Sequence, residues 1–150
     1  MKRWMTILLV IVLICSVVGC GKEKGEKWEW RIGKESNREF TDLLEMRLSE
    51  NGATATGAEF VVCNHTQQRY CYGADFEMEV LKKGVWYKMI TVPGLDATAE
   101  ERSVDAKNIK LDSSSWPAKL PRGTYRLIKR MYPEGRREEA VFVYGEFSVK

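Results

Sequence analysis

Histidine is almost absent from this sequence, which has one such residue, His65, among 150. Nucleophilic catalysis needs a base within hydrogen-bond reach of a serine, threonine or cysteine, and His65 could serve only Cys63 or Cys71 nearby in the chain. One histidine and two cysteines without carboxylates at ligand spacing also fall short of a tetrahedral zinc site. The sequence has no glycine-rich phosphate loop. We therefore expect no enzyme, no metal and no cofactor.

Two acidic pairs could in principle act as acid and base. Glu77 and Glu79 alternate with apolar residues, which predicts that both lie on the solvent face of a strand. Glu138 and Glu139 fall in a polar stretch. We interpret all four as solvated surface residues.

The first nineteen residues predict a secretory signal peptide. Lys2 and Arg3 precede an apolar run, residues 6–15, and small residues follow. The run is shorter than the roughly 20 apolar residues that a membrane-spanning helix needs. Shortly after the run, Val17-Val18-Gly19-Cys20 resembles the lipobox of bacterial lipoproteins.

The lipobox resemblance implies cleavage before Cys20 and lipidation of that cysteine. Two or more acyl chains hold a protein stably on a bilayer, so the expected partner is a membrane and the expected location is the outer side of the cell membrane. The alternative is an ordinary secreted protein with an incidental cysteine.

An excess of charge of one sign is also missing. The chain has 24 basic and 21 acidic residues, and two of the basic ones would leave with the leader, so 22 would remain against 21. Nucleic-acid binding needs a concentrated basic surface, so this balance argues against a nucleic-acid partner.

Two cysteines remain as side-chain thiols of the folded part, Cys63 and Cys71. In an exported protein such a pair is a candidate disulfide, worth roughly 2.5 kcal/mol for so short a loop. The alternative is two buried free thiols.

The mature chain opens with a charged tether, residues 21–27, which has no apolar residue to bury. Residues 28–32 then alternate between apolar and charged side chains and predict a strand. A second interpretation places Trp28 and Trp30 at the level of the lipid headgroups, where indole rings are favoured.

Short alternating runs and turn residues fill the rest of the sequence and predict an all-β fold. Asn51-Gly52 is expected to turn the chain between the first pair of strands, and Lys83-Gly84 between the second pair. A weaker strand is expected around 102–111 and a hairpin at the C-terminus. The expected strands of this region are 44–48, 58–63, 76–80, 85–90, 102–111, 124–132 and 140–149.

Four segments of the C-terminal two-thirds stand in a specific order and spacing: 72–79, 83–87, 120–126 and 147–149. Together they resemble the bacterial immunoglobulin-like domains of small lipoproteins and secreted proteins, and the resemblance covers residues 42–150. It implies an antiparallel β-sandwich of about seven strands. We therefore divide the chain into a leader (1–19), a lipidated cysteine with tether and lead-in strand (20–41) and an immunoglobulin-like domain (42–150).

Two aromatic residues in these segments are expected to be structural. Residues 120–126 resemble a tyrosine corner, in which the hydroxyl of Tyr125 would bond a backbone carbonyl a few residues upstream. Trp86 is expected in the core rather than on a ligand-binding surface, because cores take up large aromatic rings. The cysteine pair departs from the family pattern.

The expected function is that of a membrane-anchored, non-catalytic binding or accessory module, with a protein or cell-envelope component as partner. One alternative is an extracellular protease inhibitor that presents the loop between Cys63 and Cys71, because a disulfide would preorganise that loop for binding. The other is a purely structural envelope lipoprotein.

Overall fold

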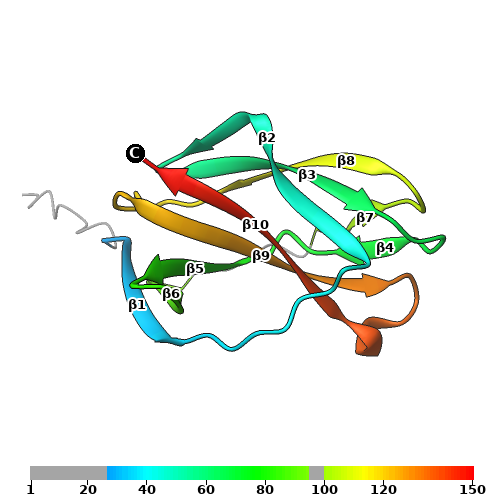
Figure 1. Ribbon diagram of the computed structural model, residues 1–150, viewed down its shortest axis with the longest axis horizontal. Helices are drawn as coiled ribbons and strands as arrows, with labels where there is room; N and C mark the ends of the chain where they lie inside the picture. The colour runs from blue at the N-terminus through cyan, green and yellow to red at the C-terminus, as the bar shows by residue number, and fades with distance from the viewer. Residues whose placement is uncertain (1–26, 95–99) are drawn as a thin grey trace, which may run out of the picture.

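The computed structural model describes residues 27–94 and 100–150, and these form an antiparallel β-sandwich (Figure 1), as the alternating sequence predicts. One short 3-10 helix, η1, joins the last two strands. The bounds are β1 Glu29–Glu35, β2 Leu44–Thr54, β3 Gly57–Asn64, β4 Tyr70–Tyr72, β5 Glu77–Lys82, β6 Val85–Val92, β7 Arg102–Val104, β8 Ile109–Ser115, β9 Gly123–Pro133, η1 Arg137–Glu139 and β10 Val141–Val149.

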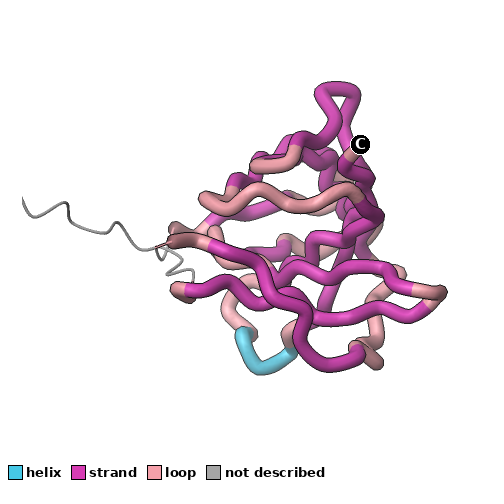
Figure 2. The backbone as a smooth tube through the Cα atoms, turned by 90° about the vertical axis from the view of Figure 1, so that its left-hand side faces the viewer, coloured by secondary structure: helices cyan, strands magenta, loops and turns pink. Residues whose placement is uncertain are grey.

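Two sheets of unequal size make the sandwich (Figures 1 and 2). The large sheet has the order β1-β6-β5-β9-β4-β7, and β10 pairs with the other edge of the long strand β9. The small sheet has the order β2-β3-β8. The edge strands β2 and β10 therefore meet on one side of the sandwich, where the sheets join without a backbone ladder between them.

Aromatic rings fill the space between the sheets. Phe147 of β10 lies 6.0 Å from Phe60, 5.7 Å from Trp116 and 5.7 Å from Tyr125, measured between ring centroids. All four side chains are buried. Such pairs add about 0.5–1.5 kcal/mol each beyond the area that they bury.

Trp86 is not part of this core, so that expectation was wrong. It lies on β6 between Val85 and Tyr87, is half-buried, and stacks on the guanidinium of Arg126 at 4.4 Å on the outer face of the large sheet. The tryptophan of the core is Trp116, which is 4% exposed and donates from Nε1 to the carbonyl of Ala55.

The hairpins were predicted with one error. Lys83 and Gly84 both have positive φ (50° and 81°) and turn β5 into β6, and the C-terminal hairpin is present as β9 and β10. The turn between β2 and β3 lies instead at Ala55 and Thr56. Gly52, with φ 73°, falls inside β2 where the register shifts, so its positive φ serves a β-bulge rather than the hairpin turn.

Two segments differ from the expected organisation. The run 102–111 is not one strand: β7 pairs with β4 in the large sheet, and β8 pairs with β3 in the small sheet. The lead-in strand β1 pairs with β6, and Trp30 donates from Nε1 to the carbonyl of Ala118 at 2.7 Å. The lead-in strand thus adds an edge to the large sheet ahead of residue 42, and the described residues form ten strands.

The tyrosine corner is present, since Tyr125 Oη donates to the carbonyl of Pro121 at 2.7 Å. Tyr125→Phe should lower the free energy of unfolding by about 1 kcal/mol, because it removes one partly buried hydrogen bond and leaves a carbonyl without its donor. Urea unfolding of the two proteins measures this difference. Tyr144→Phe, at a half-buried ring on β10, is the control and should stay within about 0.5 kcal/mol of the wild type. Equal losses in both variants would contradict the assignment.

In the described part of the chain, none of the helical structure is long and apolar enough to cross a membrane. The predicted signal peptide, the lipobox with Cys20 and most of the tether lie outside the described residues.

Candidate functional site

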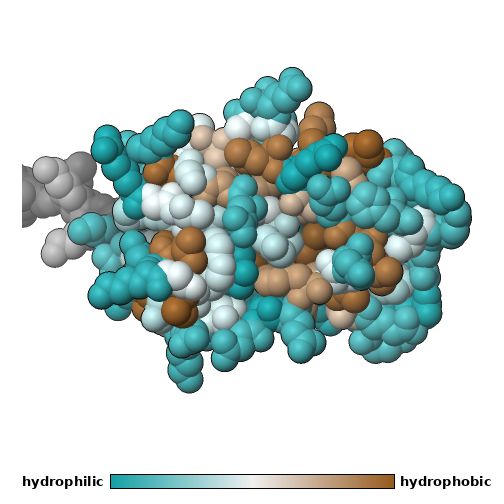
Figure 3. Space-filling view, in the orientation of Figure 1, coloured by the Kyte–Doolittle hydropathy of each residue, from teal (hydrophilic) through white to brown (hydrophobic). Residues whose placement is uncertain are grey.

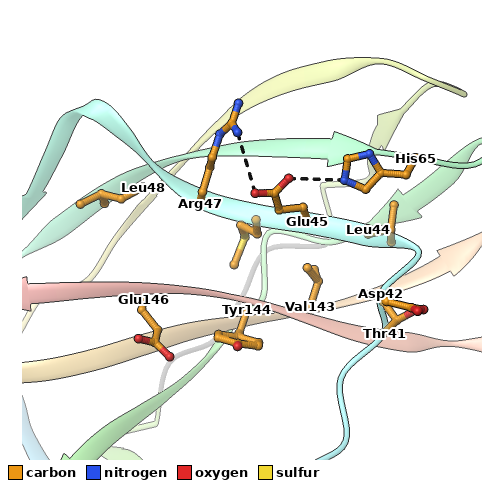
Figure 4. Close-up of a pocket in the computed structure, with 11 residues that line it drawn as sticks. Thr41, Asp42, Leu44, Glu45, Arg47, Leu48, His65, Val143, Tyr144 and Glu146 are labelled. Atoms are coloured by element: carbon orange, nitrogen blue, oxygen red, sulfur yellow. Dashed lines mark ion pairs between the residues drawn. The ribbon is translucent and has the colours of Figure 1, made fainter.

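A groove of about 600 Å³ follows the line where β2 and β10 meet (Figure 4). Thr41 N donates to the carbonyl of Phe142 at 2.9 Å and ties the chain before β2 to the start of β10. Beyond this bond the two strands run side by side as the edges of different sheets (Figure 1). The groove is therefore a consequence of the way in which the sandwich closes.

The floor of the groove is apolar and its walls are polar because side chains alternate along both strands. Leu44, Met46 and Val143 point inward and are at most 4% exposed. The residues between them point outward and line the walls (Figure 4). They are Glu45 and Arg47 on β2 and Tyr144 and Glu146 on β10.

Carboxylates outnumber cations around the groove. Glu45 lies 3.4 Å from His65 Nε2 and 3.8 Å from Arg47 Nη1, and the three side chains are about half exposed (Figure 4). Asp42 and Glu146 take part in no ion pair with any described residue. Exposed pairs of this kind contribute at most about 1 kcal/mol each, so Glu45 remains available to a partner.

The sole histidine, His65, is exposed beside Glu45 and makes no side-chain hydrogen bond to a hydroxyl or thiol in the described part of the chain. The described residues also contain no group of three histidine, cysteine or carboxylate side chains that could hold a metal ion. The groove thus has an apolar floor and charged walls.

Residues 40–147 match the family model described as the bacterial Ig-like domain. The chain belongs to this family. The match covers every strand except β1 and the last residues of β10. Bacterial Ig-like domains are typically non-catalytic. No curated protein sequence matches the chain.

Of the two arrangements considered for the cysteines of this bacterial Ig-like domain, a disulfide or two buried free thiols, the structure has the second, since Cys63 and Cys71 are buried and unbonded. Cys63 follows the core residue Val62 in the small sheet, and Cys71 lies between the core residues Tyr70 and Tyr72 in the large sheet. Alternation therefore turns the two cysteines away from the core on opposite sheets, which pack about 10 Å apart. A disulfide needs Cα atoms within about 7 Å.

Both thiols should consequently be recovered unoxidised. Unfolding the protein without reductant in the presence of iodoacetamide should alkylate Cys63 and Cys71 fully, as peptide mass spectrometry would show. Reductant should change the free energy of unfolding by less than about 0.5 kcal/mol, because no cross-link is lost. Burial also raises the pKa of the Cys71 thiol, so the folded protein should react slowly. A linked 63–71 peptide pair would contradict this prediction.

The loop between the two cysteines is held by Asn64. Its Nδ2 donates to the carbonyls of Gln68 at 2.6 Å and Asp105 at 3.0 Å, and its Oδ1 accepts from the backbone N–H and the hydroxyl of Thr66. The bond from the backbone N–H of Thr66 to the side chain of Asn64 makes an Asx turn, and an asparagine two residues before a threonine is a sequence signal for it. Sequence reasoning assigned the bracing of this loop to a disulfide, whereas a buried carboxamide supplies it.

Glu79 was wrongly expected at the solvent face. It is fully buried, and its carboxylate lies 2.5 Å from Arg126 Nε and also accepts from the hydroxyl of Ser36. The guanidinium of Arg126 stacks on Trp86, Phe40 and Tyr144 at 4.4–5.4 Å. The chain between β1 and β2 crosses the outer face of the large sheet and covers this pair, and short-range sequence patterns do not reveal such a cover.

A second charged cluster lies between the sheets. Asp112 pairs with Arg102 at 2.5 Å, and Lys129 Nζ lies 3.6 Å from the other carboxylate oxygen and donates to the carbonyl of Ala74. Burial lowers the pKa of Lys129, and the charge of Asp112 opposes that effect. Lys129 and Asp112 are almost completely buried, so we assign this cluster to the core rather than to a binding site.

Proposed function

We propose that this protein is a bacterial lipoprotein, anchored through Cys20 outside the cytoplasm, whose Ig-like domain is a non-catalytic module that binds a protein partner. The β2–β10 groove carries the proposal, since it joins an apolar floor to exposed charged walls. Concave, largely apolar surfaces with a few polar groups are the usual form of binding sites. The anchor rests on the signal and lipobox sequence.

The charge of the groove indicates the chemistry of the partner. Three carboxylates, those of Asp42, Glu45 and Glu146, line the groove. The basic residues that line it are Arg47 and His65. Opposite charges steer association and exclude like-charged partners. We therefore propose a partner segment with aliphatic side chains for the floor and lysine or arginine for the walls.

The tether limits where that partner can be. Residues 21–27 span at most about 25 Å when fully extended. The domain would stay close to the lipid surface, so the partner belongs to the membrane or to the adjacent envelope.

Crosslinking on intact cells tests the proposal. The wild type is compared with Cys20→Ser and with the isosteric double variant Asp42→Asn/Glu146→Gln, and adducts are recovered and identified by mass spectrometry. Glu138→Gln, on the exposed helix η1, is the matched control. We expect an adduct that falls at least fivefold in the groove variant and is unchanged in the control.

The outcomes separate the parts of the proposal. An adduct that the groove variant leaves unchanged would contradict the groove as the binding site. Retention of Cys20→Ser on the membrane, or the absence of labelled palmitate from the wild type, would contradict the anchor. Recovery of nothing specific would favour the purely structural envelope role.

The Asn64 bonds favour a protease inhibitor as the second candidate, because they preorganise the exposed loop at residues 65–69 without a disulfide. This role requires that the protein slow at least one extracellular protease and that Asn64→Ala relieve the inhibition. The groove variant would leave such inhibition unchanged.

A further inference from the structure

The free edge of β8 has unpaired backbone groups. Asn64 N donates to the carbonyl of Asn108, and Trp116 N donates to the carbonyl of Thr56, both at 3.0 Å and both in the register of the β3–β8 ladder. Because backbone groups alternate in direction along a strand, the even-numbered residues of β8 bond to β3 and the odd-numbered ones face away. Apart from the N–H of Ile109, which bonds Asn108 Oδ1, these outward groups have no partner among the described residues.

The same odd-numbered residues carry exposed apolar side chains. Ile109 and Leu111 are 63% and 59% exposed, although both are large aliphatic residues. Leu111 lies beside Val61 in the register of the small sheet, and Ile109 lies beside Cys63. Cys63 is buried, so the exposed apolar surface consists of Ile109 and Leu111 together with the partly exposed Val61.

The features that usually keep an edge strand from pairing with another chain are missing or already engaged in β8. Proline, a bulge or an outward-pointing lysine would normally prevent pairing, and β8 has none of them. Its inward-pointing charges are already bonded within the molecule: Lys110 Nζ donates to the carbonyl of Ser103, and Asp112 pairs with Arg102. A strand added at this edge would consequently leave both charges with their present partners.

We infer that a second copy of this chain occupies the edge, with the two β8 strands antiparallel and Leu111 opposite Leu111 of the second copy. Self-complementarity supports this register. It joins the outward N–H and C=O groups of the two strands, and it leaves Lys110 and Asp112 of each copy with their present partners on the inner face. The two small sheets become one continuous sheet, and closed two-fold pairs of this kind are the commonest soluble oligomers.

The dimer leaves the β2–β10 groove open, because β2 is at the opposite edge of the small sheet from β8. Figure 3, in the orientation of Figure 1, shows hydrophobic and hydrophilic groups interspersed on the visible face. The inference does not depend on the lipid anchor or on the proposed partner, so its failure would leave both in place.

Cysteine crosslinking of the full-length protein in cells tests the dimer. Residues directly opposite in a bonded antiparallel pair have Cα atoms about 5.5 Å apart, within disulfide range. Leu111→Cys should therefore form a disulfide with a second copy under mild oxidation and run at twice the mass of the single chain on a non-reducing gel. Ile90→Cys, at a 55%-exposed position in the large sheet, is the matched control.

We expect at least a tenfold excess of crosslinked dimer for Leu111→Cys over Ile90→Cys. In sedimentation experiments on the detergent-solubilised protein, Leu111→Lys should raise the dimer dissociation constant at least tenfold and Ile90→Lys should leave it unchanged. Equal crosslinking of the two cysteine variants, or a wild type that is monomeric at every concentration, would overturn the inference.

Discussion

Glu79→Gln should lower the free energy of unfolding by about 3–5 kcal/mol, although glutamine has nearly the same shape as glutamate. The substitution removes the charge that compensates Arg126, which is 8% exposed. Breaking one side of a buried ion pair leaves the other charge in a medium of low dielectric constant without its counterion. Chemical denaturation measured by tryptophan fluorescence would report the loss.

Glu77→Gln is the matched control for this experiment. Glu77 lies two residues earlier on β5, points to the same face, and pairs with Arg38 and Lys88 at the exposed margin of the sheet. Its substitution should cost less than about 1 kcal/mol. Similar losses at the two positions would mean that the chain between β1 and β2 does not cover Glu79.

A double-mutant cycle with Arg126→Met measures the interaction between Glu79 and Arg126 directly. Methionine keeps part of the packing against Trp86 and Phe40 without a charge. The double variant Glu79→Gln/Arg126→Met should be more stable than the sum of the single losses predicts, because neither charge is then left alone. Strict additivity would contradict a direct pair.

Gly145→Ala should cost about 3 kcal/mol, the second large effect. A Cβ atom at this position would lie 2.4 Å from Cε1 of Phe60 and 3.3 Å from the carbonyl oxygen of Met46. Phe60 is completely buried and packs on Phe147, so its ring cannot withdraw without strain. Thermal unfolding would measure the loss.

Gly94→Ala is the control, since a Cβ there meets no atom of the described residues within 4 Å and the backbone φ is not positive. It should change stability by less than about 0.5 kcal/mol. The double variant Gly145→Ala/Phe60→Leu should lose less free energy of unfolding than the sum of the two single losses, because the smaller side chain at position 60 relieves the overlap with the added methyl group. Strictly additive losses would mean that the strain in Gly145→Ala does not come from contact with Phe60.

The Gly145 contact also bears on the proposed binding site. The missing side chain lets β10 approach the backbone of β2, and this approach forms the seam along which the groove runs. Gly145→Ala should therefore weaken crosslinking to the partner as well as stability, whereas Tyr125→Phe should affect stability alone.

The local sequence pattern predicted much of the architecture. Alternation identified the β5–β6 and β9–β10 hairpins, and Lys83-Gly84 provided the positive φ angles that the β5–β6 turn requires. The segment 120–126 indicated the tyrosine corner because its geometry is set within a few residues. The near-neutral charge and the single histidine came from composition and limited the classes of function before any fold was known.

The tertiary structure decided which faces of the strands are covered. Glu77 and Glu79 are equivalent in the alternating pattern, yet only Glu79 lies under the chain that crosses the large sheet. Cys63 and Cys71 are close in sequence but lie in different sheets, because the chain crosses over between them.

The groove likewise has no signature in the sequence, since it lies between strands about 100 residues apart. Alternation specifies that a strand has two faces, and periodicity identifies the apolar one. The pairing of edges and the path of the crossover decide what covers each face. Fold class and the predicted leader are therefore properties of the sequence by itself, whereas the buried ion pair, the free thiols and the groove exist only once the two sheets have closed on each other.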